Sequence, residues 1–466
     1  MPQLSTFYQS HYIHLAIAFS SGIIFYYAID AIREQDSAFW QFTPPPALRR
    51  FVSRVTPSVP AVPDSVQRKL DAAGLGSDEP TQGLPPAGVG IDSAIGNTSL
   101  FKLSSLSDRI GCSIYLKAEA LNPGGSPKDR VALSILNSLE LQYGLVPHSG
   151  DTIYEATVGS TGISLAMLCR ARGYGCHIIM PSDQSIEKSD LLEKLGAVVE
   201  RVTPAPITDT KHFVNQARMK AKEHFEKGEK GESNGPEGKG RGFFADQFET
   251  DANWKAHYEG TGPEIWKQMH GEQYEEDGLD AFVAGAGTGG TVSGVGMYLK
   301  EEAGQIMRDR IPKIVVADPQ GSGLYNKITH GVFFSQYERE GTRRRDQVDT
   351  MIEGIGLTRS TANFEKGWQE GVIDGAVKVS DEQAGLMARW LVENEGLFVG
   401  GSTAVNVVGA MKTGIEMQKE RGAGGKLVTI WCDSGMRHLS KFWKGTEISG
   451  ENKVRIEDIL ESEGTG

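Results

Sequence analysis

Short apolar runs alternate with helical segments through most of the 466-residue chain. Residues 113–119 (SIYLKAE), 152–155 (TIYE) and 176–180 (CHIIM) have the length and composition of short strands, and 161–172 (TGISLAMLCRAR) favours a helix. Strands that alternate with helices build βαβ units, so the pattern predicts an α/β fold with doubly wound, mostly parallel sheets. The length allows a large core, which we expect to be divided between two lobes.

An almost uncharged run, residues 12–29 (YIHLAIAFSSGIIFYYAI), lies near the N-terminus. As a helix it would span about 27 Å, at the short end for a bilayer crossing. No Lys or Arg precedes it, which disfavours a secretory signal, and basic residues follow it, which predicts that the rest of the chain faces the cytosol. We expect an uncleaved transmembrane anchor within residues 1–35, with a buried core helix as the alternative. A single span with mild flanking charge suits the mitochondrial outer membrane.

Three further segments have compositions that disfavour regular structure. Residues 36–92 are rich in proline: nine of the chain's 20 prolines lie within 43–86, which predicts a semi-stiff linker. Residues 226–242 (EKGEKGESNGPEGKGRG) predict a solvated loop insertion. Residues 446–466 are short and charged, and we expect them to be a tail.

Composition narrows the possible functions. The net charge of −12 argues against nucleic-acid binding, which needs a basic surface. The apolar fraction of 39% and the 57 glycines suit an α/β enzyme with many tight turns. The four cysteines form no C-x-x-C pair and have no zinc-site spacing, so we expect free thiols and no metal site; they are Cys112, Cys169, Cys176 and Cys432.

One lysine stands at the start of a helical run, in residues 122–130 (NPGGSPKDR). Ser126 is suited to cap the helix, and Pro127 suits its first turn. Lys128 would then lie beside backbone N–H groups that disfavour an ammonium, so its pKa would fall and its amine could attack a carbonyl. On spacing alone, a solvated lysine after a loop is the simpler alternative.

Two loops rich in Gly and Thr each follow an apolar strand and open a helix. They are residues 155–162 (EATVGSTG) and 285–294 (GAGTGGTVSG). Backbone N–H groups, hydroxyls and a helix N-terminus bind anions in such loops. A plain strand-to-helix turn accounts for the first equally well, and a dinucleotide site is open for the second. No Lys follows the second loop as in a P-loop, which disfavours nucleotide hydrolysis.

These motifs, in their order along the chain, resemble those of the pyridoxal-phosphate-dependent cysteine synthase and cystathionine β-synthase family. The resemblance covers about residues 95–444 and includes 247–248 (QF), 353–356 (EGIG) and 430–440 (IWCDSGMRHLS). Within the family the chain is similar to fungal membrane-anchored cysteine synthase-like proteins. The resemblance implies a homodimer of fold type II (tryptophan synthase β-like) with pyridoxal 5′-phosphate as cofactor. It also implies a catalytic domain at 93–445, with a smaller lobe at about 125–250 and a larger lobe at about 93–124 and 251–445.

The resemblance implies a role for each matching residue. Lys128 would hold the cofactor as a Schiff base and act as the catalytic acid and base. The other cofactor-binding residues would be Ser160 at the phenolic oxygen, Ser434 at the pyridine nitrogen, and Gly287, Thr288, Gly289, Gly290 and Thr291 at the phosphate. The carboxylate of the substrate would be bound by Thr157, Gly159, Thr161 and Gln247.

The implied reaction is cysteine synthesis. An activated serine such as O-acetylserine would lose acetate by β-elimination to an aminoacrylate, and sulfide would then add. The neutral hydroxyl of Ser434 favours β-elimination over transamination, because it does not force the pyridine nitrogen to be protonated. The expected partners are therefore a small amino-acid substrate, sulfide and, through residues 12–29, a lipid bilayer.

Several departures from the family pattern leave alternatives open. Val158 replaces a carboxylate-binding Ser, and Ser160 replaces the Asn that contacts the phenolic oxygen. One lost hydrogen bond to an anion typically costs about 1.5–3 kcal/mol. The alternatives are cystathionine β-synthase-like chemistry with homocysteine, serine/threonine dehydration, and a catalytically attenuated, membrane-tethered protein that keeps the cofactor. His438 replaces a Tyr, and we expect it to be structural rather than catalytic.

Overall fold

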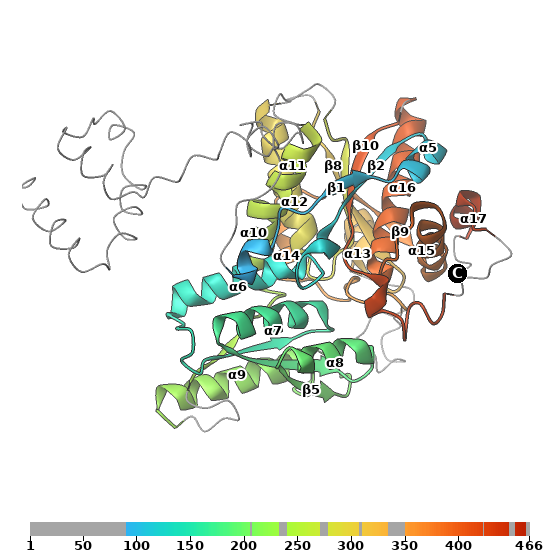
Figure 1. The fold of residues 1–466 in the computed structure, drawn as a ribbon. Coiled ribbons are helices and arrows are strands. Elements are labelled where there is room, and N and C mark those ends of the chain that lie inside the picture. The colour runs from blue at the N-terminus through green and yellow to red at the C-terminus, as the bar shows by residue number, and fades with distance from the viewer. Residues whose placement is uncertain are drawn as a thin grey trace, which may run out of the picture. The chain divides into compact units, whose positions relative to one another are not determined.

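The computed structural model describes residues 90–205, 207–232, 240–270, 278–306, 310–333, 350–422, 424–446 and 453–462. In these ranges the chain forms two β-sheets with helices packed around them (Figure 1). The predicted membrane anchor at residues 12–29 and nearly all of the predicted linker lie outside the described residues. No helix within the described ranges is long and apolar enough to cross a membrane.

The larger sheet has six strands in the order β1-β2-β10-β7-β8-β9. Neighbouring strands are parallel except β1 and β2, which pair antiparallel. The predicted α/β fold with mostly parallel sheets is therefore confirmed. The strands are β1 (Leu100–Lys102), β2 (Ser113–Lys117), β7 (Ala281–Ala284), β8 (Lys313–Pro319), β9 (Gly375–Val379) and β10 (Lys426–Ile430).

Alternate residues of the central strands enter two separate cores, because side chains of a strand point to opposite faces in turn. On β7, Ala281 and Val283 pack with α5 (Ser104–Ile110), α15 (Asp381–Glu395) and α16 (Gly401–Arg421). Phe282 and Ala284 pack on the other face. The helices there are α11 (Gly262–His270), α12 (Gly290–Ile306), α13 (Leu324–His330) and α14 (Ala362–Gln369). Both faces of the sheet are thus covered, as in a doubly wound fold.

The smaller sheet has four parallel strands in the order β5-β4-β3-β6. They are β3 (Thr152–Ala156), β4 (Gly175–Pro181), β5 (Val198–Val202) and β6 (Gly242–Phe244). One face packs on α6 (Lys128–Tyr143), α7 (Ser160–Arg172), α8 (Ile186–Lys194) and Ile91 of the short helix η2 (Ile91–Ala94). The other face packs on α9 (Phe213–Glu229). We call this sheet with α6 to α9 the smaller lobe, and the larger sheet with its helices the larger lobe.

Helix α6 links the smaller lobe to the larger. It packs against α7 and also against α10 (Asp251–Ala256), which in turn packs against α12 of the larger lobe (Figure 1). Three further short helices are described: η3 (Glu119–Leu121), the π-helical turn η4 (His257–Thr261) and η5 (Gly435–Arg437).

Two segments are more ordered than the sequence predicted. The predicted loop at 226–242 is shorter, because α9 continues to Glu229 and β6 begins at Gly242. Lys222 and Glu226, four residues apart, lie 3.9 Å from each other on the last turns of α9. In the predicted tail, α17 (Ile456–Glu461) packs on α15 and buries Ile456 and Ile459. Their spacing of three residues places both on one helix face.

Helix α16 lies close to the larger sheet at one of its glycines. A Cβ on Gly409 would lie 2.6 Å from the Cβ of Ala317 on β8 and 3.3 Å from Cγ1 of Val283 on β7. Glycine within a helix is less favourable than alanine by about 0.5–1 kcal/mol. The contact therefore accounts for a residue that helix propensity disfavours.

We predict that Gly409→Ala lowers the thermal midpoint of the protein, because overpacking costs about 1–3 kcal/mol and exceeds the gain in helix propensity. Gly385→Ala on α15 is the control, since its Cβ would lie 3.7 Å from the nearest atom, Oγ1 of Thr446. That change should raise the midpoint slightly. Scanning calorimetry of both variants tests the packing, and a midpoint that rises equally in both would contradict it.

Candidate active site

Lys128 is the first residue of α6, at the junction of the two lobes. The Lys128 N–H donates to Oγ of Ser126 at 3.2 Å, and Pro127, with φ of −60°, precedes the helix. The helix thus begins at Lys128, one residue later than predicted. The hydroxyl of Ser126, two residues before the helix, accepts the N–H of its first residue. Ser126 is 2% exposed, so this turn is held inside the protein.

The side chain of Lys128 is partly buried. Burial lowers the pKa of Lys128, while nearby Cys432, Asp433 and Glu119 oppose this effect. Among the residues that the structure describes, its Nζ has no hydrogen-bond partner. A desolvated amine with a lowered pKa is the form that attacks carbonyl carbon. The lowered pKa predicted from the sequence is confirmed in direction, and burial is its main cause.

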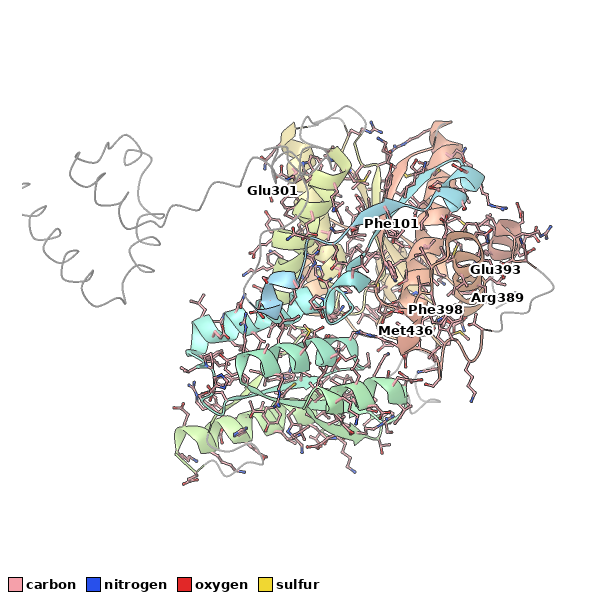
Figure 2. The ribbon with its side chains drawn as sticks, viewed as in Figure 1. Phe101, Glu301, Arg389, Glu393, Phe398 and Met436 are labelled. Carbon is pink, nitrogen blue, oxygen red and sulfur yellow. The ribbon has the colours of Figure 1, made fainter. Side chains whose placement is uncertain are left out.

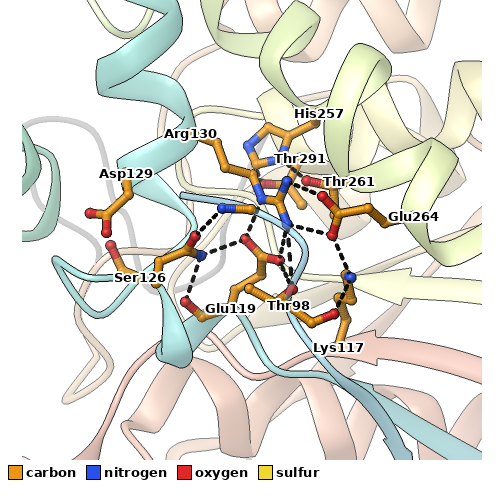
Figure 3. A network of polar contacts seen from close by, with 12 residues as sticks. Thr98, Lys117, Glu119, Ser126, Asp129, Arg130, His257, Thr261, Glu264 and Thr291 are labelled. Atoms are coloured by element: carbon orange, nitrogen blue, oxygen red, sulfur yellow. Dashed lines mark hydrogen bonds and ion pairs between the residues drawn. The ribbon is translucent and has the colours of Figure 1, made fainter. Parts of the chain in front are cut away.

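A buried ion network fixes the start of α6 to the larger sheet (Figure 3). Arg130 Nε and Nη2 donate to the two carboxylate oxygens of Glu119 at 2.7 and 2.8 Å, and its Nη1 donates to Glu264 at 2.7 Å. Lys117 on β2 donates to the other oxygen of Glu264 at 2.6 Å and to the carbonyl of Thr98 at 2.7 Å. Two cations thus face two carboxylates, as buried charges require. The sequence analysis assigned no role to this network.

The carboxyl end of β3 carries the loop predicted to bind the carboxylate of a substrate. Oγ1 of Thr161 donates to Oε1 of Gln247 at 2.6 Å, across 86 residues of sequence. Nε2 of Gln247 donates to the carbonyl of Ala156 at 3.0 Å, and the N–H of Gly159 donates to Oγ1 of Thr157 at 3.2 Å. The structure therefore brings together the four residues that the sequence proposed for this role.

The loop predicted to bind phosphate connects β7 to the N-terminus of α12. Gly289 has φ of +87°, and a Cβ on Gly287 would lie 2.0 Å from the carbonyl oxygen of Gly354, so both positions require glycine. The Gly290 N–H donates to Oγ1 of Thr288 at 3.4 Å, a long contact, and the N-terminus of α12 favours an anion at this loop. Gly290, which opens α12, packs against Asn253.

Asn253 and His257 hold the two threonine hydroxyls of this loop. Nδ2 of Asn253 donates to Oγ1 of Thr288 at 3.0 Å. His257 Nε2 lies 3.1 Å from Oγ1 of Thr291, and its Nδ1 lies 3.0 Å from Oγ1 of Thr261 (Figure 3). Burial lowers the pKa of His257 well below its usual range, so the ring is neutral and donates from one nitrogen only. Neither Asn253 nor His257 was among the predicted site residues.

Ser434 follows β10, and Ser160 is the first residue of α7. Oγ of Ser434 accepts the N–H of Met436 at 3.3 Å, while the Gly435 N–H donates to the carbonyl of Phe398 at 3.0 Å. Figure 2 shows Met436 and Phe398 near each other at this end of the larger lobe. The hydroxyl of Ser164 donates to the carbonyl of Ser160 at 3.0 Å. Ser434 and Ser160 are both partly buried, and each has a neutral hydroxyl.

This set of donors fits pyridoxal phosphate. The Lys128 amine suits the aldehyde, the N-terminus of the 17-residue helix α12 suits the phosphate, and the hydroxyl of Ser434 suits the pyridine nitrogen. The loops after β3, β7 and β10 all lie at the carboxyl ends of parallel strands, where such folds bind ligands. Within the described ranges, no cluster of His, Cys, Asp and Glu could hold a metal ion.

We predict that Glu264→Gln destabilises the protein by about 3–5 kcal/mol near neutral pH, because Arg130 and Lys117 are left with one carboxylate. Although burial opposes ionisation, Arg130 and Lys117 lower the pKa of Glu264 to about 2. The stabilisation is therefore complete above the unfolded pKa and is lost as the pH falls from about 5 towards 2. The difference in thermal midpoint between wild type and Glu264→Gln should therefore shrink as the pH is lowered through this range.

Glu259→Gln, on an exposed carboxylate of η4, removes the same charge and serves as the control. It should change the midpoint little at any pH. If the difference in thermal midpoint between Glu264→Gln and wild type does not depend on pH, the ionised network is contradicted.

Three comparisons place the chain among known proteins. The family model for pyridoxal-phosphate dependent enzymes matches residues 91–433. "Cysteine synthase 2" of Emericella nidulans is 56% identical over 382 residues, which cover 81% of this chain and 85% of the relative. "Putative mitochondrial cysteine synthase" of Saccharomyces cerevisiae is 48% identical, over 82% of this chain and 90% of the relative.

Among solved structures, an O-ureido-L-serine synthase matches with a TM-score of 0.60 and 28% identity, over 78% of this chain and 98% of that one. The extent of the family match and the identity to these relatives agree with the site described above. The chain therefore belongs to the pyridoxal-phosphate dependent enzymes.

Proposed function

We propose that the protein is a cysteine synthase, which exchanges the acetate of O-acetylserine for sulfide. The observation that carries the proposal is the position of Lys128, whose amine has no hydrogen-bond partner among the described residues, beside the loops at the carboxyl ends of β3, β7 and β10. The relatives named as cysteine synthases support the same conclusion, because they match over about four fifths of the chain.

The chain's own residues would hold the cofactor at three points. Lys128 would bind its aldehyde carbon, and Gly287, Thr288, Gly289, Gly290 and Thr291 its phosphate. Ser434 would contact the pyridine nitrogen, and Ser160 would lie toward the phenolic oxygen. Bound there, pyridoxal phosphate supplies an electron sink for the bond-breaking at the substrate.

The substrate's carboxylate would bind at Thr157, Gly159, Thr161 and Gln247. This would place the substrate's Cα near Nζ of Lys128, which would take the α-proton as acetate leaves and return it after sulfide has added. The lowered pKa of Lys128 supports this role, because it makes the neutral amine, which can accept a proton, easier to form. The hydroxyl of Ser434 is neutral, which favours elimination at Cβ over transamination.

We also propose the organisation of the whole chain. Residues 1–35 would anchor it in a membrane, with the catalytic domain facing the cytosol from the mitochondrial outer membrane. The relative from Saccharomyces cerevisiae, named as a mitochondrial cysteine synthase, supports a mitochondrial location. The catalytic domain would act as a homodimer. The proposed boundaries are 36–92 for the linker, 93–445 for the catalytic domain, and 446–466 for the tail; within the domain, 125–250 form the smaller lobe, and 93–124 with 251–445 the larger.

The test is the visible absorption of the full-length protein, purified in detergent with its cofactor. We expect a cofactor band that changes on addition of O-acetylserine and returns with sulfide as cysteine appears. Lys128→Ala should lower the rate of cysteine formation by about 100- to 10,000-fold, because it removes the catalytic acid and base. Lys255→Ala, on an exposed lysine of α10, should leave the rate unchanged.

Competition between nucleophiles separates the alternatives. If homocysteine restores the band faster than sulfide, the protein is a cystathionine β-synthase. Pyruvate release without either nucleophile indicates a dehydratase. A band that never responds to O-acetylserine would contradict cysteine synthesis, and the absence of a band would contradict the cofactor assignment.

A further inference from the structure

Four buried charged side chains form a continuous series of contacts from the smaller lobe to the larger. Lys188 on α8 donates to Oε2 of Glu353 at 2.5 Å, and Nδ1 of His438 donates to the same oxygen at 3.2 Å. On the other side of its ring, Nε2 of His438 donates to Oδ2 of Asp433 at 2.9 Å. The four residues are between 2% and 8% exposed. We call Lys188, Glu353, His438 and Asp433 the inter-lobe relay.

One end of the relay lies under the loop proposed to bind the substrate's carboxylate. A Cβ on Gly159 would lie 2.4 Å from Cδ of Lys188 and 3.1 Å from its Cγ. The aliphatic part of Lys188 therefore fills the space beside Gly159, and its charged end continues to Glu353. Because close-packed interiors transmit small displacements, the position of this loop depends on where Lys188 is held.

The rest of the relay adjoins the residues proposed to hold the cofactor. Glu353 directly precedes Gly354, whose carbonyl oxygen would lie 2.0 Å from a Cβ on Gly287 in the phosphate loop. Asp433 directly precedes Ser434. The relay thus contacts or adjoins all three loops of the candidate site, and Asp433 itself lies in the loop after β10.

The charges of the relay are balanced. Both ring nitrogens of His438 face carboxylate oxygens, so both donate and the ring is an imidazolium. Although burial opposes this charge, Asp433 and Glu353 raise the pKa of His438. Two cations then face two carboxylates. Lys441 approaches Oε1 of Glu353 at 3.3 Å, and its side chain is 35% exposed, so this pair is screened by water.

We infer that His438 is a positioning residue that acts through two separate hydrogen bonds, one to Asp433 and one to Glu353. We call these the Asp433 arm and the Glu353 arm. Through Asp433 it orients the hydroxyl of Ser434 toward the cofactor. Through Glu353 and Lys188 it holds the loop at Gly159 in place for the substrate. The inference rests on the proposed function, since it takes the roles of both loops from there.

Two substitutions separate the arms. The amide nitrogen of Asn reaches the place of Nδ1, so His438→Asn keeps the bond to Glu353 and loses the bond to Asp433. The amide nitrogen of Gln reaches the place of Nε2, so His438→Gln keeps the bond to Asp433 and loses the bond to Glu353. Both remove the same positive charge, so each is the matched control of the other.

We expect different results from the two variants. His438→Asn should shift the visible band of the bound cofactor and weaken binding of pyridoxal phosphate to the apo-protein about tenfold, the effect of one lost charged hydrogen bond. Its KM for O-acetylserine should stay within about twofold of wild type. His438→Gln should raise that KM about tenfold and leave the band and the cofactor affinity unchanged.

The same changes in both variants, or a lower thermal midpoint with no other change, would show that His438 is only structural and would overturn the inference. If neither variant folds, Lys188→Met decides, because it keeps the aliphatic contact with Gly159: the inference requires a raised KM, and an unchanged KM overturns it. Lys441→Ala is the control and should leave every parameter unchanged.

The test also separates this inference from the proposed function. A wild-type protein that binds the cofactor but makes no cysteine would contradict the proposed function, whereas the cofactor affinities of the two His438 variants would still decide the Asp433 arm.

Discussion

The start of α6 depends on the ion network of Arg130, Glu119, Glu264 and Lys117. Lys117 and Glu119 are 0% exposed, so neither charge is hydrated and each needs its partner. The partners come from β2, η3, α6 and α11, which the network ties together. Lys128 lies two residues before Arg130, so the network also determines where its amine lies. The backbone that carries the Lys128 side chain is therefore held in place by residues other than Lys128 itself.

Buried polar side chains also hold the loops of the site in place, as the ion network holds the start of α6. Gln247, Asn253 and His257 lie on one segment and bond to residues of both anion-binding loops. Lys188 and His438 extend the contacts to the loops at Gly159 and Ser434. Thr161, Thr288 and Thr291 are thus each held by a buried polar side chain from another element. Such support keeps short loops in place, which catalysis requires.

Sequence patterns predicted the fold and the location of the site because both depend on local signals. Strand and helix periodicity, and Gly-rich turns after strands, reveal α/β units and their ligand-binding ends. The supporting contacts could not be predicted in the same way: Glu264 and Arg130 are 134 residues apart, and Lys188 and Glu353 are 165 apart. No periodicity connects such pairs. The helix at 456–461 was missed because its two buried isoleucines lie within a charged segment.

The central claim is that Lys128 holds pyridoxal phosphate covalently. Reduction of the holoprotein with borohydride makes that bond permanent, and mass spectrometry of the peptides then locates it. The account predicts the added mass of the reduced cofactor on the peptide that contains Lys128 and on no other. Added mass on a different lysine, or on none, would contradict it.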